Sequence, residues 1–202
     1  MALPTLDVLD KDGLPVTVNT LQSGRSAAAD SSSAALSTED KASLDALARA
    51  AYNSVCTITR PANTTPYSIN DSVGGALTFA SAGPSAGGTI IITGAQLELD
   101  ISAIPSGMTS FRLHLYNVTP PSATADNGAW DLPSGDRASY LGYVDLGTPV
   151  DLGSTCYVEQ TNLVKQIATA SGSIYGYLVT PTAYTPAANS EVYKITLHTM
   201  GI

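Results

Sequence analysis

The 202-residue sequence contains few charged residues. It has 9 basic residues (Lys and Arg) and 17 acidic residues (Asp and Glu), which gives a net charge of -8. Charged residues make up 13% of the chain, about half the usual share. A protein that binds DNA or RNA neutralises phosphates with Lys and Arg, so no nucleic-acid partner is predicted. Low charge is typical of a surface that partners largely cover, because a bare surface needs charge for solubility.

Long apolar runs and export signals are also lacking. No run of 18 apolar residues occurs, so neither a transmembrane helix nor a membrane partner is predicted. The opening stretch, MALPTLDVLDKDG, has early acidic residues and lacks the basic segment of a secretory signal. We therefore expect the protein to be made and assembled in the cytoplasm without export.

Cysteine and histidine are scarce. Cys56 and Cys156 lie far apart in the sequence, and in a reducing cytoplasm two thiols are favoured over the alternative, a disulfide. No Cys/His zinc spacing is present. The only histidines, His114 and His198, have no carboxylate or nucleophile near them in a catalytic pattern. The sequence therefore predicts no catalytic residue, no metal site, no cofactor and no enzymatic activity.

The N-terminal part, residues 1–53, is predicted to be an arm with a small hairpin at its start. Two alternating runs flank the turn dipeptide Asp12-Gly13. An Ala/Ser-rich tract at 21–36 buries little and is interpreted as a tether.

A short helix is predicted to follow the tether, over about 38–52, with Ser37 as its N-cap. Its apolar stripe is too narrow for a helix that stands alone, so it is expected to pack on a neighbour. The arm residues predicted to bind partners are the apolar ones of hairpin and helix: Leu6, Val8, Leu9, Val16, Val18, Leu44 and Leu47.

The apolar pattern changes to a period of two at about residue 54, which predicts a β-sandwich domain over 54–202. In 111–116, Phe, Leu and Leu alternate with Arg, His and Tyr, and 193–198 alternates in the same way. The strands expected are Val55–Arg60, Tyr67–Val73, Ala76–Ala80, Thr89–Leu99, Ser110–Asn117, Ser139–Leu146, Cys156–Gln160, Gly172–Thr180 and Glu191–Thr199. Such a series favours an antiparallel jelly roll, with an immunoglobulin-like sandwich as the alternative.

A long connection at 119–139 is the candidate ligand or contact segment, because long loops in compact domains are usually functional. It holds the only Trp of the chain. Its polar residues could build a carbohydrate or metal site around that ring; alternatively, the Trp plugs the end of the sandwich and the acids cap turns, or the loop contacts another subunit. The residues concerned are Asp126, Asn127, Trp130, Asp131 and Asp136.

Three phrases of the domain carry a resemblance to a known family. They are ITRPANTTPYSINDSVGG, SGMTSFRLHLYNVTPPSATADNGAWDLPSGDRASYLGYVDLG and AANSEVYKITLHTMGI. Together with the leader DKDGLPVTVNTLQSG, they resemble virion structural proteins of tailed bacteriophages. The resemblance covers most of 54–202, and the family supplies no catalytic residues.

The resemblance implies a particle component with the major capsid protein or other virion subunits as partners. A head decoration (cement) protein is expected, located on the head surface and assembled in the host cytoplasm. A trimer is expected only by analogy with other decoration proteins. A receptor- or glycan-binding module of a head or tail fibre, and a neck or tail-completion protein, remain the alternatives.

Overall fold

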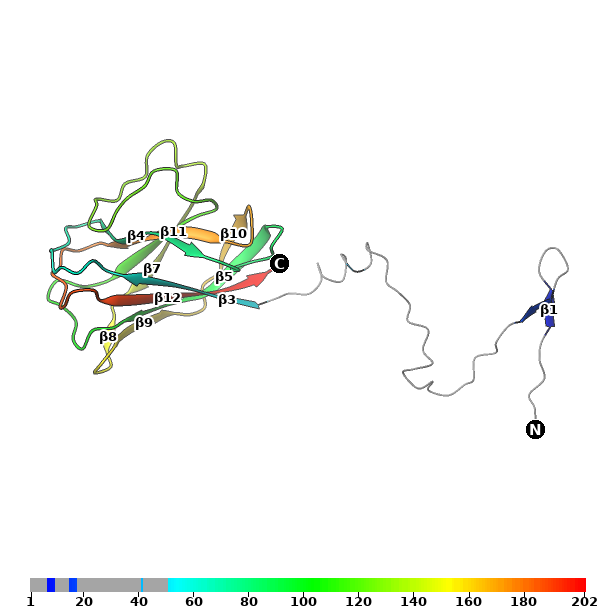
Figure 1. The fold of residues 1–202 in the computed structure, drawn as a ribbon, viewed down its shortest axis with the longest axis horizontal. Coiled ribbons are helices and arrows are strands. Elements are labelled where there is room, and N and C mark those ends of the chain that lie inside the picture. Colours follow the sequence, from blue (N-terminus) through cyan, green and yellow to red (C-terminus); the bar gives the residue numbers. More distant parts are fainter. Residues whose placement is uncertain (1–6, 10–14, 18–40, 42–50) are drawn as a thin grey trace. The chain divides into compact units, whose positions relative to one another are not determined.

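The computed structural model describes residues 7–9, 15–17, 41 and 51–202. The chain divides into two compact units, Met1–Leu47 and Ala48–Ile202. Figure 1 shows the second unit as two layers of strands. The separate folding of residues 54–202 stays a prediction, but a fragment that contains the whole sandwich has to start at or before Ala51, where its first strand begins.

The first unit contains the predicted hairpin strands. β1 (Asp7–Leu9) and β2 (Pro15–Thr17) pair antiparallel, with Val8 opposite Val16. The Asp12-Gly13 turn and the Ala/Ser tether lie outside the described residues. Of the helix predicted over 38–52, Lys41 is helical, whereas Ala51 and Tyr52 belong to a strand. The predicted C-terminal end of that helix is therefore wrong, because these residues pair with the last strand of the domain.

The second unit is an antiparallel β-sandwich. Its strands are β3 (Ala51–Thr59), β4 (Asp71–Phe79), β5 (Gly88–Leu99), β6 (Phe111–Tyr116), β7 (Tyr140–Gly147), β8 (Val150–Asp151), β9 (Cys156–Gln160), β10 (Lys165–Thr169), β11 (Ile174–Thr180) and β12 (Val192–Gly201). One sheet has the order β3-β12-β5-β9-β8, with β10 also on β5, and the other has the order β4-β11-β6-β7.

These strand orders define a jelly roll. Without the accessory strands β8 and β10, the eight main strands follow the order 1-8-3-6 in one sheet and 2-7-4-5 in the other. Two interleaved Greek keys produce this arrangement. The predicted jelly-roll sandwich is confirmed, and the immunoglobulin-like alternative is excluded by the strand order.

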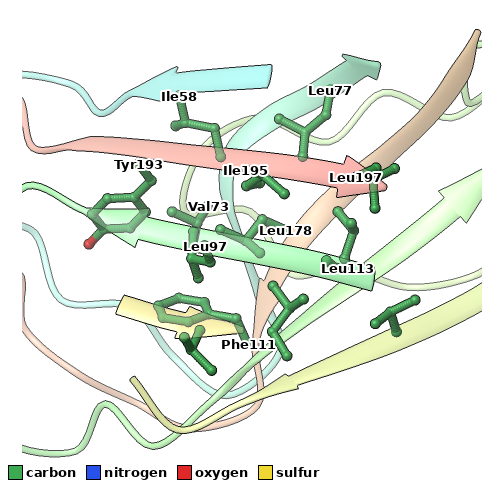
Figure 2. Packing of buried hydrophobic residues seen from close by; sticks show 14 of the residues in the cluster. Ile58, Val73, Leu77, Leu97, Phe111, Leu113, Leu178, Tyr193, Ile195 and Leu197 are labelled. Carbon is green, nitrogen blue, oxygen red and sulfur yellow. The ribbon is translucent and has the colours of Figure 1, made fainter. Parts of the chain in front are cut away.

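The core lies between the two sheets and is built from their alternating inward residues. Figure 2 shows Leu97, Ile195 and Leu197 of one sheet packed against side chains of the other, including Leu113 and Leu178. All five are fully buried. Each aliphatic side chain buried in this way contributes roughly 1.5–3 kcal/mol to folding. The burial of these inward side chains, which recur at every second position, therefore holds the two sheets together.

Two strands test the predicted alternation. In β12, Tyr193, Ile195 and Leu197 are buried as predicted. On its predicted polar face Lys194 and His198 are half-buried, but Thr196 is buried as well, so that face is confirmed only in part. In β6 the inward residues are also as predicted. The predicted polar face of β6 is nevertheless wrong, because His114 and Tyr116 are 5% and 1% exposed. The loop that follows β6 in the chain folds back and covers them.

Other differences from the prediction are local. The strands predicted at Tyr67–Val73 and Ala76–Ala80 are one strand, β4, which continues through Gly74 and Gly75 at positive φ. The register with β11 shifts at the same point, which explains why the alternation breaks there. The short strands β8 and β10 were not predicted. Both cysteines are free thiols, and burial raises the pKa of each.

Candidate functional site

The loop between β6 and β7, residues 117–139, lies along the edge of β4. Asp71 and Ala129 form an antiparallel bridge. Ser72 N donates to Gly128 O at 2.8 Å, and Asn127 N donates to Ser72 O at 2.8 Å. The loop therefore acts as a short extra strand, which closes the edge of this sheet where β4 begins.

Asp136 closes the base of this loop. The residue is 2% exposed, and its carboxylate accepts hydrogen bonds from Ser122 Oγ at 3.0 Å and Ser122 N at 3.1 Å. Its own N–H donates to Pro133 O at 3.0 Å in a turn. Because charged acceptors make stronger hydrogen bonds than neutral ones, Asp136 fixes the two ends of the loop together.

An aromatic cluster fills the space between the loop and the outer face of the β4-β11-β6-β7 sheet. Trp130 lies over His114 with ring centroids 3.7 Å apart. The buried Tyr177 hydroxyl accepts from Thr124 N at 3.1 Å and donates to Ser122 O at 3.0 Å. The cluster, here called the second core, consists of Tyr116, Tyr177 and Val179 with Trp130, Leu132, Tyr140 and Tyr175 packed against them.

His114 is held neutral beneath the loop. Burial, with a contribution from neighbouring Arg112, lowers the pKa of His114 to about 4. Its Nδ1 lies 2.9 Å from the Tyr140 hydroxyl, and burial also raises the pKa of Tyr140. At neutral pH these two side chains are an uncharged hydrogen-bonded pair, which suits packing better than proton transfer.

A buried polar network joins the tip of the loop to the rest of the domain. The Tyr67 hydroxyl donates to Asp126 Oδ1 at 2.6 Å and accepts from Arg60 Nε at 2.6 Å. Gly74 N donates to the same carboxylate oxygen at 2.8 Å. Burial raises the pKa of Tyr67 far above its ordinary value, so this hydroxyl stays protonated and keeps donating.

Arg60 carries the positive charge of this network. The residue is 2% exposed, and its Nη1 lies 3.5 Å from Glu191 Oε2, in an ion pair whose side chains are both 1% exposed. The Tyr193 hydroxyl donates to the same Glu191 oxygen at 2.7 Å. A buried charge needs such partners, because an unpaired one would be strongly destabilising.

The structure brings four of the five predicted loop residues into contacts within the domain. Asp126 and Asp136 accept the hydrogen bonds described above, and Trp130 covers His114. The Asn127 amide, oriented to face its acceptors, donates to Pro66 O and to Asp71 Oδ2, both at 3.1 Å. Asp131 is exposed. Trp130 lies on the outer sheet face, so the interpretation that it plugs the end of the sandwich is wrong.

The predicted arm residues are described only in part. Val8, Leu9 and Val16 lie in β1 and β2, whereas Leu6, Val18, Leu44 and Leu47 lie outside the described residues. Sequence reasoning missed the roles of Arg60 and Glu191. The available signal was a charged residue beside each of two paired strands: Arg60 directly follows β3, and Glu191 directly precedes β12.

The described part of the chain contains neither a metal-binding cluster nor a membrane-spanning helix. Within these residues, no group of three or more His, Cys, Asp or Glu side chains gathers as a metal site would require. Among the same residues, no helix has the length and apolar character needed to cross a bilayer.

Comparison with known proteins gives distant structural likenesses. No family model and no curated protein matches the chain. It is similar to a chain of the heated full particle of Israeli acute paralysis virus, with 16% identity over 99% of this chain and 92% of that one and a TM-score of 0.32.

Two further solved structures show how broad this likeness is. PRD1 vertex protein P5 has 9% identity over 72% of this chain and 95% of that one, with a TM-score of 0.29. A lipoprotein of Bacteroides thetaiotaomicron has 11% identity over 73% and 88%, with a TM-score of 0.32. At such low identities and TM-scores, no property of these proteins is transferred to this chain.

Proposed function

We propose that this chain is a non-enzymatic structural protein of a virus particle, and that it decorates and stabilises the assembled head. The observation that carries the proposal is the division into a jelly-roll unit, Ala48–Ile202, and a separate N-terminal unit with its own hairpin. This organisation suits a domain that stands on a lattice and an arm that attaches it. The resemblance of the domain's sequence to tailed-phage virion proteins supports the same role.

The energy of attachment would come from the arm. Its apolar residues lie in a hairpin and a predicted helix with little core of their own. Burying each such side chain contributes roughly 1.5–3 kcal/mol before ordering costs, and linked subunits multiply the effect. Binding to the assembled lattice and not to free subunits would raise the resistance of the lattice to disruption.

The loop geometry favours this role over a glycan-binding fibre module. Three of its four predicted polar ligand groups, those of Asp126, Asn127 and Asp136, already bond within the domain. A sugar would have to compete with these bonds. An intersubunit contact through the exposed parts of the loop needs no such exchange.

The test is decoration of particles that lack the protein. The full chain should bind them at a copy number comparable to that of the major capsid protein, and they should then retain DNA to a higher temperature. A variant lacking residues 1–36 should stay folded and fail to bind. Full occupancy by this truncated variant would show that the jelly roll is the anchor, and a copy number of only a few per particle would indicate a fibre or neck component.

A further inference from the structure

The edges of the two sheets differ in how they are protected. An exposed sheet edge offers unpaired N–H and C=O groups to other chains, and proteins blunt such edges with charges, bulges, proline or covering loops. The edge of β4 is covered where it begins, because Asp71 and Ser72 bond to the 117–139 loop. The edge strand β7 contains Asp145 and has register shifts near both ends of its pairing with β6.

The accessory strands protect the far edge of the other sheet. β8 has two residues and ends in Asp151. β10 has five residues and begins with Lys165. Short strands and charged side chains both discourage the pairing of another chain.

β3 has none of these protections. Its nine residues, Ala51–Thr59, include no charge, glycine or proline. It pairs with β12 over its whole length without a register shift. Within the described residues, no strand pairs with its other edge. β3 is therefore a long, regular and uncharged edge strand.

The backbone groups on this free edge can be assigned from the pairing. Arg60 N donates to Glu191 O across the β3–β12 pair. Because bonded positions alternate in an antiparallel ladder, the even-numbered residues of β3 bond to β12 and the odd-numbered ones point outward. Asn53, Val55 and Thr57 therefore present their N–H and C=O groups to the free edge.

The corner between β3 and β4 does not use these groups. Ser54, which faces inward, donates from its hydroxyl to Ala80 O at 2.6 Å. The outward side chains do not block access either, since Asn53 and Thr57 are exposed and Val55 is 50% exposed. The free edge is thus available to a strand that approaches from outside.

The first unit of the chain holds a strand pair that such an edge would stabilise. β1 and β2 have three residues each and form a two-stranded sheet. A two-stranded hairpin alone is marginally stable at best in water, and a third strand is one of the additions that make it stable, packing against a helix being another. Residues 18–50 join it to β3, and a connection of this length can span up to ~110 Å, enough to reach another copy.

We infer that the free edge of β3 accepts the β1–β2 hairpin of a second copy of this chain, which extends the β3-β12-β5-β9 sheet across the two molecules. Main-chain hydrogen bonds to Asn53, Val55 and Thr57 would hold it, as in other cases of strand addition. The contact joins two different surfaces, so it can close a ring of copies. It does not depend on the proposed role in a virus particle.

Hydrogen exchange of the full chain, followed by NMR at single amides, tests the inference. At high protein concentration the amides of Val55 and Thr57 should exchange at least roughly tenfold more slowly than at high dilution. A tenfold slowing corresponds to the net free energy of about one backbone hydrogen bond. Val8→Pro, which removes a donor and breaks a strand, should abolish this protection. Val8→Thr, which keeps the backbone donor and the branched side chain, should retain it.

The edge itself is tested by the double substitution Val55→Lys and Thr57→Lys, with Gln166→Lys on the edge strand β10 as the control. The double variant should be monomeric by sedimentation, and the control should associate like the unmodified chain. Protected amides on the β12-facing side of β3 show that each variant is folded.

Three outcomes would overturn the inference. Rapid exchange of Val55 and Thr57 at every concentration would mean that the edge stays free. Protection that does not change with dilution would place the chain's own hairpin on the edge. Protection that survives Val8→Pro would identify another occupant, such as β3 of the second copy.

Discussion

The two sheets of the jelly roll have similar sequence patterns but differ on their outer faces. On the β3-β12-β5-β9 sheet that face is polar: Lys194 Nζ and Glu98 Oε1 are 2.8 Å apart, and Gln96 donates to Glu159 at 3.1 Å. On the β4-β11-β6-β7 sheet the outer face is aromatic and lies under the 117–139 loop. An alternating strand thus does not by itself tell whether its second face meets water.

The difference shows that the covered face is a second, smaller core with its own polar anchors. Asp136 holds the base of the loop, and the hydrogen bonds that link Arg60, Tyr67 and Asp126 hold its tip. Loss of an anchor should therefore destabilise the covered sheet far more than a matching change on the polar sheet.

The largest effect is expected from Arg60→Met. The substitution leaves Glu191 buried without its positive partner, and breaking a buried pair costs about 3–5 kcal/mol. Urea denaturation should show this loss in the free energy of unfolding. The matched change Lys194→Met removes a partly exposed pair and should cost no more than about 1 kcal/mol. Equal effects would mean that the buried network is no more important than the surface pair.

Trp130→Ala should have the next largest effect. It removes the ring that covers His114 and opens a void in the second core, at a cost of about 3 kcal/mol in the free energy of unfolding. Hydrogen exchange should accelerate at Tyr177 and Val179 while the β12 amides keep their protection. Gln96→Ala, on the polar face, is the control and should change stability by roughly 0.5 kcal/mol or less. If protection fell equally in both sheets, the second core would not be a separate unit.

Acid should weaken the covered face through His114. Its folded-state pKa of about 4 lies below the ordinary 6.5, so the unfolded chain takes up the proton first as the pH falls. The resulting loss of stability is absent above about pH 7 and grows between pH 6.5 and 4, to roughly 3 kcal/mol. Thermal unfolding across this range measures it. His114→Gln should remove this part of the slope and His198→Gln should not; an unchanged slope in His114→Gln would contradict the assignment.

The smallest effect distinguishes two acids of the loop that look alike in the sequence. Asp131→Asn should change the free energy of unfolding by less than about 0.5 kcal/mol, because the residue is exposed. Asp136→Asn weakens the charged acceptor of two Ser122 bonds and should cost about 1–2 kcal/mol. Thermal melting of the two variants side by side is sufficient, and the reverse order would mean that the base of the loop is not fixed by Asp136.

Most of the sandwich could be predicted from the sequence because inward residues repeat every second position. The inward set of β12 is an example. The sequence pattern divides β4 in two because Gly74 and Gly75 interrupt the alternation at a bulge. β8 was missed because two residues are too few for a pattern. β10 is as long as the predicted β9 but was missed because Ile167 is the one large apolar residue among its five.

The candidate site was predicted less completely than the fold. The sequence indicated the 117–139 loop and its polar residues, because a long connection with a single Trp is unusual in a compact domain. It could not indicate that Trp130 lies over His114, or that Asp126 bonds to Tyr67. These partners are distant in the sequence, and only the paired sheets bring them together.

The sequence by itself therefore determined the β class, the separate N-terminal hairpin and the residues that face the core, since each follows from local alternation and turn chemistry. Only the tertiary structure decided which outer face is covered, which acids are bonded and which edge is unprotected. The physical reason is that a face or an edge is defined by what lies against it. Here the covering residues come from a loop that folds back across its sheet, and the free edge of β3 is recognised only once every other edge has been placed.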